Sequence, residues 1–99
     1  MNSLQKNSNH SSLESLDTFI QNFEFKLLQA DLAEVEMTNK KLKFLGLNYD
    51  PFDLNLNEEC AQILENLGLS IHFQNPYVAT NILLKLLDKV EERLNNLKH

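Results

Sequence analysis

The sequence predicts an all-α protein, a small bundle of three to four helices, and three observations support this. Residues that favour helices, such as leucine, glutamate, lysine and glutamine, are abundant, whereas β-branched residues are scarce. Apolar residues recur every three or four positions over long stretches. Glycine and proline are absent from residues 1–45 and first occur at Gly46 and Pro51. With 99 residues, 42% of them hydrophobic and 23% charged, one folded domain is expected.

Residues 1–10 are polar and lack periodicity, so we expect a disordered tail followed by a single helical domain over residues 11–99. Ser11 and Glu14 have the spacing of a capping box, which predicts a helix start at Ser11. Apolar residues then recur at alternating spacings of three and four, which is typical of a helix that packs against another helix. This seam comprises Leu13, Leu16, Ile20, Phe23, Leu27 and Ala30.

A second apolar stripe runs along the same segment and is offset around the helix axis. It passes through Phe25, Leu28, Leu32 and Val35. Two apolar faces predict two neighbours for this part of the chain. The segment is expected to form one long helix or a helix pair, and Met37–Asn39 lies in the most polar part, where a break is expected if there is one. An unbroken helix of roughly 33 residues would be about 50 Å long, which exceeds what a compact domain of this size needs.

Gly46 is predicted to end this segment in the left-handed conformation. Lys40, Lys41 and Lys43 would lie in the last turns, where positive charge complements the helix dipole. Residues 47–56 follow as a connector that contains an Asp-Pro pair, which favours a turn or an extended backbone.

A short acidic helix is predicted after the connector. Asn55 or Asn57 is expected to cap it, with Glu58 and Glu59 in the first turn, where negative charge is favourable. Gly68 is expected to end it in a Schellman motif. The predicted buried face comprises Cys60, Ala61, Ile63, Leu64 and Leu67.

The C-terminal helix is predicted to begin at Asn75-Pro76, an N-cap residue followed by proline at the first helical position, and to run to about Leu97. Residues 70–74 before it are expected to be a short extended piece. The apolar stripe of this helix comprises Ala79, Ile82, Leu83, Leu86, Val90, Leu94 and Leu97. Leu84 and Leu87 widen the apolar arc beyond what one neighbouring helix requires.

The net charge of −5 is unevenly distributed, because no lysine or arginine lies between Lys43 and Lys85. The carboxylates of this interval form a predicted acidic docking face, Asp50, Asp53, Glu58, Glu59 and Glu65. Such a surface is either an ordinary solvated one or a docking site for a basic partner. Nucleic-acid binding requires clustered lysine and arginine, so direct binding of DNA or RNA is not expected.

Patterns for catalysis and metal binding are incomplete. Residues 53–57 begin like a calcium loop, but Glu58 stands where glycine is required and Leu64 where a bidentate glutamate is required. Cys60 and His72 lack the spacing of a zinc site, and nothing in the sequence supplies a third group for nucleophilic catalysis. We therefore expect no catalytic residue, no metal and no cofactor.

The predicted function is a non-catalytic protein–protein interaction module, such as a small adaptor, chaperone or regulatory subunit. The candidate interface residues are Phe25, Leu28, Leu32, Val35, Leu84 and Leu87. These apolar faces are either core of the monomer, or covered by a second copy in a homodimer or by another protein that offers a basic or amphipathic helical segment.

Two alternatives come from other classes of function. One is an acidic inhibitor that occupies the basic site of a nucleic-acid-handling enzyme or toxin, and the other is a small metal-dependent enzyme. The N-terminal residues lack the apolar segment of a secretory signal, and no apolar stretch approaches the length of a membrane span. A cytoplasmic location without a membrane partner is therefore expected.

Overall fold

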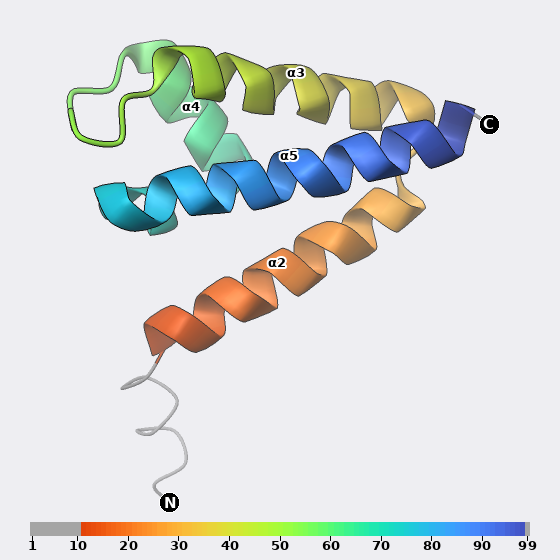
Figure 1. The fold of residues 1–99 in the computed structure, drawn as a ribbon, viewed down its shortest axis with the longest axis horizontal. Helices are drawn as coiled ribbons and strands as arrows, with labels where there is room; N and C mark the ends of the chain where they lie inside the picture. The colour runs from red at the N-terminus through yellow and green to blue at the C-terminus, as the bar shows by residue number, and fades with distance from the viewer. Residues whose placement is uncertain (1–10, 99) are drawn as a thin grey trace, which may run out of the picture.

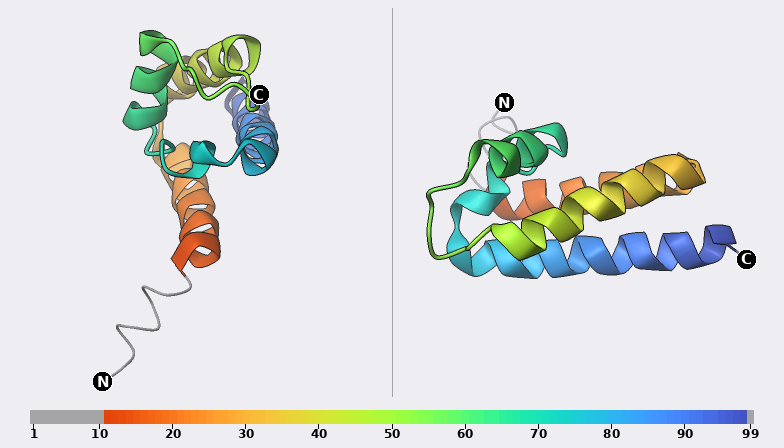
Figure 2. Two further views of the ribbon diagram at one scale, coloured as in Figure 1. Left: turned by 90° about the vertical axis from the view of Figure 1, so that its left-hand side faces the viewer. Right: turned by 90° about the horizontal axis from the view of Figure 1, so that it is seen from above.

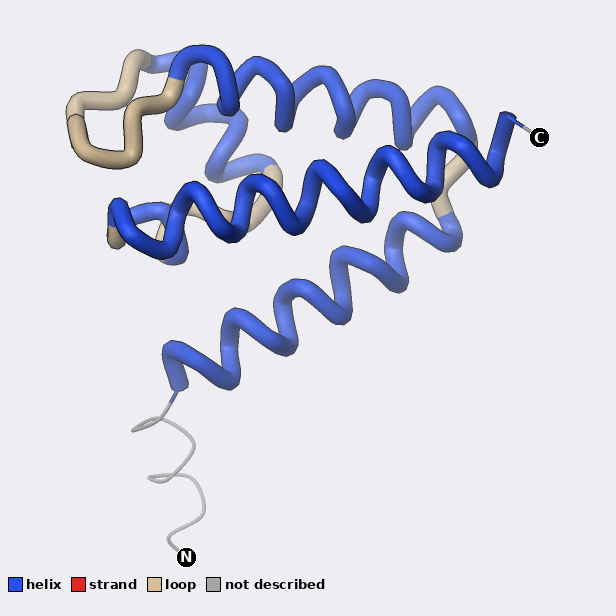
Figure 3. The backbone as a smooth tube through the Cα atoms, viewed as in Figure 1, coloured by secondary structure: helices blue, strands red, loops and turns tan. Residues whose placement is uncertain are grey.

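The computed structural model describes residues 11–98, with side chains from Leu16 onward, and every regular element in this range is a helix (Figures 1 and 3). In chain order these are α2 (Ser11–Gln29), α3 (Leu32–Asn48), α4 (Glu58–Asn66), the 3₁₀ helix η1 (His72–Gln74) and α5 (Pro76–Lys98). The predicted all-α bundle is confirmed. The predicted tail, residues 1–10, lies outside the described residues, and the Ser11 capping box outside the described side chains.

The helix α5 is the element on which the others assemble. It contacts α3, η1 and α2, and α4 contacts α3. In Figure 1, α3 runs antiparallel to α5, whereas α2 runs in the same direction as α5 and diverges from it toward its own first residues. The end-on view in Figure 2 shows α2, α3, α4 and α5 around a shared interior.

The N-terminal segment is a helix pair, and it breaks at Ala30–Asp31 rather than at Met37–Asn39. Asp31 is the N-cap of α3 in a capping box: its carboxylate accepts the amide of Glu34 at 2.8 Å, and the Glu34 carboxylate accepts the amide of Asp31 at 3.1 Å. The polar stretch stays helical, and the Thr38 hydroxyl donates to the Glu34 carbonyl oxygen at 3.0 Å within the helix. The expected break at 37–39 is therefore wrong.

The prediction that Gly46 ends the helix in the left-handed conformation is also wrong. The helix α3 continues to Asn48, and the amide of Tyr49 donates to the Leu45 carbonyl oxygen at 2.8 Å. At Gly68 the same prediction is confirmed, with a φ of 74°. There the amide of Leu69 donates to the Leu64 carbonyl oxygen at 2.8 Å, which completes a Schellman motif.

Two further helix starts agree with the sequence, and one segment does not. The Asn57 side chain accepts the amide of Cys60 at 2.7 Å, and the Asn75 side chain accepts the amide of Tyr77 at 2.9 Å. Residues 70–74 are not extended: they contain η1, in which Phe73 is buried against the core. Burial of the Phe73 ring requires a compact turn before α5, which explains why these residues form η1 and not the expected extended piece.

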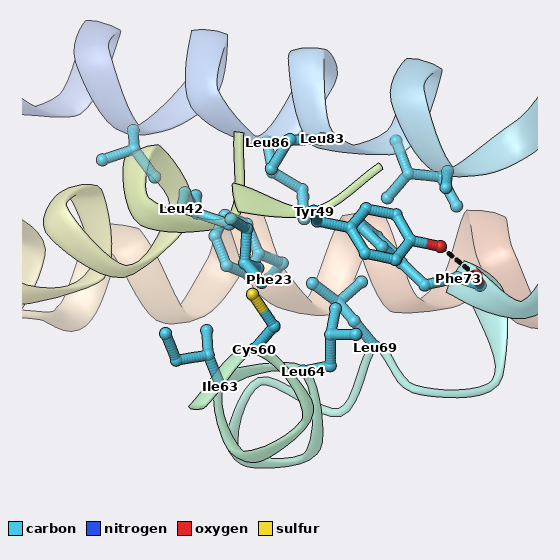
Figure 4. Packing of buried hydrophobic residues seen from close by; sticks show 14 of the residues in the cluster. Phe23, Leu42, Tyr49, Cys60, Ile63, Leu64, Leu69, Phe73, Leu83 and Leu86 are labelled. Carbon is cyan, nitrogen blue, oxygen red and sulfur yellow. Dashed lines mark hydrogen bonds between the residues drawn. The ribbon is translucent and has the colours of Figure 1, made fainter. Parts of the chain in front are cut away.

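One continuous core joins all the elements. Figure 4 shows side chains from α2, α3, α4, η1 and α5 pointing toward one another. The fully enclosed ones include Val35, Leu42, Leu45, Leu64, Leu69, Ile82, Leu86 and Val90. The Tyr49 ring lies among them, and its hydroxyl donates to the Phe73 carbonyl oxygen at 2.7 Å, so that this buried polar group has a partner.

The position of α2 is fixed by polar contacts from α5 as well as by its apolar seam. Arg93, the only arginine of the chain, donates from Nε to the Leu27 carbonyl oxygen and from Nη2 to the Leu28 carbonyl oxygen, both at 3.0 Å. These carbonyls lie in the last turn of α2, where a positive charge is favourable, and the Leu27 oxygen also accepts the amide of Ala30 at 3.3 Å. Lys89 pairs with Glu24 one turn earlier, at 3.0 Å.

The two glycines should respond oppositely to alanine. A Cβ at either position would meet only ordinary contacts, with Leu83 at 3.5 Å for Gly46 and with Phe19 at 3.5 Å for Gly68. Gly68→Ala should therefore cost about 1 kcal/mol through its positive φ alone. Gly46→Ala should stabilise by about 0.5–1 kcal/mol, because alanine favours a helix interior. Urea denaturation of both variants checks this, and a loss of stability in Gly46→Ala would contradict the assigned extent of α3.

Arg93→Met should loosen α2 selectively. The variant keeps an apolar stem of similar length but leaves two helix-end carbonyls without their charged donor, at an expected cost of about 1–2 kcal/mol. Hydrogen exchange should show the α2 amides losing protection while those of α3 and α5 keep it. Lys40→Met removes a positive charge from an exposed position on α3 and serves as the control. Equal loss of protection in all helices would contradict a local role for Arg93.

Candidate functional site

The residues that could carry chemistry are not assembled into a reactive centre. Cys60 is buried in the core, and burial together with the nearby Glu59 raises the pKa of its thiol, which favours the unreactive neutral form. The His72 ring packs against Phe19, with ring centroids 5.6 Å apart. In the part of the chain that the structure describes, no group of three His, Cys, Asp or Glu residues is placed to hold a metal ion.

The predicted second apolar stripe is divided between two helices by the break between α2 and α3. Phe25 and Leu28, on α2, are 59% and 61% exposed, and Leu32, at the start of α3, is 38% exposed. Val35 has no exposed surface, so its placement in the interface was wrong. The chain changes direction at Ala30–Asp31, and α3 thereby turns Val35 into the core.

A groove between α2 and α5 adjoins the exposed α2 residues. A hollow of about 440 Å³ lies between the two helices and is lined in part by Phe25, Leu28 and Arg93. A second hollow of about 380 Å³ extends it toward the start of α2 and shares Gln21 and Lys89 with the first. We call these two hollows together the α2–α5 groove.

The predicted interface residues on α5 lie elsewhere. Leu84 is exposed and Leu87 is half-buried against the core. Neither of them lines the α2–α5 groove. The predicted interface residues of α5 therefore do not meet Phe25 and Leu28 in this groove.

All five carboxylates of the predicted acidic face are exposed, and four of them cluster at one end of the bundle. Asp50 and Asp53 lie in the connector, and Glu58 and Glu59 in the first turn of α4 that follows it. Glu65 lies in the last turn of α4, at the other end of that helix. In Figure 1 the connector, the start of α4 and the start of α5 lie together at the left of the molecule. We call this region the acidic end.

The acidic end also carries exposed apolar side chains that were not among the residues predicted to form a contact surface. Phe52, Leu54, Ile71 and Tyr77 are all exposed, and the rings of Phe52 and Tyr77 meet edge to face, 5.7 Å between centroids. A hollow of about 280 Å³ beside them is lined mainly by Tyr49, Leu54, Leu56, Leu64 and Phe73. A signal was present, because residues 49–56 hold four large apolar residues in a connector, where polar residues are usual.

Comparison with known proteins gives no relative for this chain: no protein-family model, curated protein or solved structure matches it. Among the described helices, none combines the length and the apolar character needed to cross a membrane.

Tyr49 links the stability of the acidic end to pH. Burial, with a smaller contribution from Asp50, raises the pKa of the Tyr49 hydroxyl above its usual value. The unfolded chain then loses this proton at a lower pH than the folded protein does, so folding stability should fall as the pH rises above about 10. Tyr49→Phe should cost about 1–2 kcal/mol at neutral pH, because the buried Phe73 carbonyl loses its donor.

The difference in unfolding free energy between wild type and Tyr49→Phe should shrink above about pH 10. Urea denaturation of both proteins from neutral to alkaline pH measures it. Tyr77→Phe changes a ring that is 76% exposed and should leave stability at neutral pH unchanged. A constant difference between wild type and Tyr49→Phe across the pH range would contradict the prediction.

Proposed function

We propose that this protein is a non-catalytic protein–protein interaction module, of the adaptor, chaperone or regulatory-subunit type. Its main contact surface would be the exposed side of α2 that carries Phe25 and Leu28, which we call the outer face of α2. The observation that carries this proposal is the exposure of Phe25 and Leu28 beside the α2–α5 groove. Large apolar side chains next to a hollow are typical of surfaces that another protein covers.

A second copy of the chain is the partner that fits this face. The two hollows of the groove are lined by four carboxylates, Asp17, Glu24, Asp88 and Glu92, and by three cations, Lys85, Lys89 and Arg93, so its charges nearly cancel. Two copies of an acidic protein repel each other least where the charges of the surface cancel. An isologous contact would place Leu28 of each copy near the two-fold axis and would bury Phe25 and Leu28 of both copies.

The acidic inhibitor stays a second candidate, favoured by the four carboxylates of the acidic end. In that function the acidic end would occupy the basic site of a nucleic-acid-handling enzyme or a toxin. Binding of this kind falls steeply with salt, whereas contact through the outer face of α2 should change little.

Leu28→Asp should separate the dimer into folded monomers. The substitution places a charge in the centre of the proposed contact but at a position exposed in the single chain, so the helical circular dichroism should be kept. Light scattering at about 100 µM should give twice the 11.5 kDa chain mass for wild type and the chain mass for the variant. Leu47→Asp, at an α3 residue that is 86% exposed, is the matched control and should stay dimeric. A monomeric wild type would contradict the dimer.

A further inference from the structure

The hollow at the acidic end has an apolar interior that opens to the surface. Tyr49 and Phe73 form part of its wall, held together by the hydrogen bond between the Tyr49 hydroxyl and the Phe73 carbonyl and by ring contact at 5.3 Å between centroids. Leu54 lines the hollow and is 63% exposed at the same time. A volume of about 280 Å³ leaves room for one large apolar side chain from outside.

The surroundings of the hollow carry charge of one sign. Asp50 and Asp53 lie in the connector, which contributes Leu54 to the wall of the hollow. Glu58 and Glu59 precede Ala61, which also lines the hollow. One carboxylate oxygen of Asp50 accepts the amide of Phe52 at 2.9 Å, and one of Asp53 accepts the amide of Asn55 at 3.0 Å. The other oxygen of each carboxylate accepts no hydrogen bond from the residues that the structure describes. No lysine or arginine occurs in residues 44–84 to neutralise these groups.

We propose that the acidic end binds a basic amphipathic segment of another protein. The segment would insert an apolar side chain into the hollow beside Leu54 and place its lysine or arginine side chains against Asp53 and Glu58, which precedes Ala61 by three residues and so lies on the same side of α4. The exposed edge-to-face pair of Phe52 and Tyr77 would cover the apolar flank of the segment. This site is separate from the outer face of α2, and the proposal does not depend on the dimer.

Charge complementarity selects this partner over the others. A second copy would bring the same carboxylates to the site, and like charges in close contact are unfavourable. Nucleic acids and anionic membrane surfaces carry negative phosphate groups, which the acidic end repels. A basic segment gains from both features of the site, since the charges guide its approach and the hollow retains its apolar side chain.

Fluorescence anisotropy with a labelled synthetic peptide of leucine and lysine, patterned as an amphipathic helix, tests the proposal on the full chain. Two variants of the protein probe the two features. Leu54→Ser removes an exposed apolar group from the hollow and should weaken binding about tenfold. Asp53→Asn/Glu58→Gln removes two charges, while the introduced asparagine keeps a side-chain oxygen that can accept the Asn55 amide, and should weaken binding about fivefold at low salt.

The matched control for charge is Glu36→Gln/Glu91→Gln, which makes the same change in net charge at exposed positions of α3 and α5. It should bind the peptide as wild type does. A peptide with serine in place of leucine should bind at least tenfold more weakly, because it lacks the apolar anchor. Equal binding of the two peptides, equal weakening by both charge variants, or no effect of Leu54→Ser would each overturn the proposal. Leu28→Asp should bind as wild type does, so the test is independent of the α2 contact.

Discussion

The buried stripe of α5 is the feature on which the arrangement of the other helices depends. Six of its side chains are buried, and they contact elements that are far apart in the sequence. Each large apolar side chain removed from water contributes about 1.5–3 kcal/mol, so this one helix provides much of the driving force for the fold. The buried arc is wide because α3 packs on one part of it and α2 on another. The breadth of the apolar pattern in the sequence, including Leu87, follows from these two neighbours.

The helix α2 is attached less tightly than α3, and its attachment has a specific chemistry. Among its described side chains, Phe23 and Leu27 are buried, whereas Leu16, Phe19 and Ile20 are half-buried. Arg93 compensates at the far end by binding the carbonyls of Leu27 and Leu28. An element held by few buried contacts opens at lower free energy than the core does. Contact with another protein on the outer face of α2 would therefore stabilise the element that needs it most.

The sequence predicted those features that depend on local hydrogen bonding. Asn57, Gly68 and Asn75 act as expected because the backbone geometry at a helix end depends on residues within one turn. Asp31 and Glu34 have the same capping-box spacing as Ser11 and Glu14, and they fix the break between α2 and α3. The polar run at 37–39 was the more conspicuous feature of the sequence, so the break was expected there. Gly46 shows the limit of local reasoning, because glycine favours a helix end without requiring one, and α3 continues through it. The hollow at the acidic end was missed since it joins residues of the connector, α4 and η1, which only the tertiary structure brings together.

The distribution of charge distinguishes the two proposed contact surfaces of this small protein. The charged side chains that line the α2–α5 groove nearly cancel, and Glu24 pairs there with Lys89, whereas the four carboxylates of the acidic end have no ion-pair partner among the described residues. In the proposed dimer, self-repulsion would keep the two acidic ends apart and open to solvent. Each dimer would then present two sites for basic segments, and a partner with two such segments would bind with an effective concentration set by the distance between them. Self-association through α2 would in this way strengthen binding at the acidic end without any contact between the two surfaces.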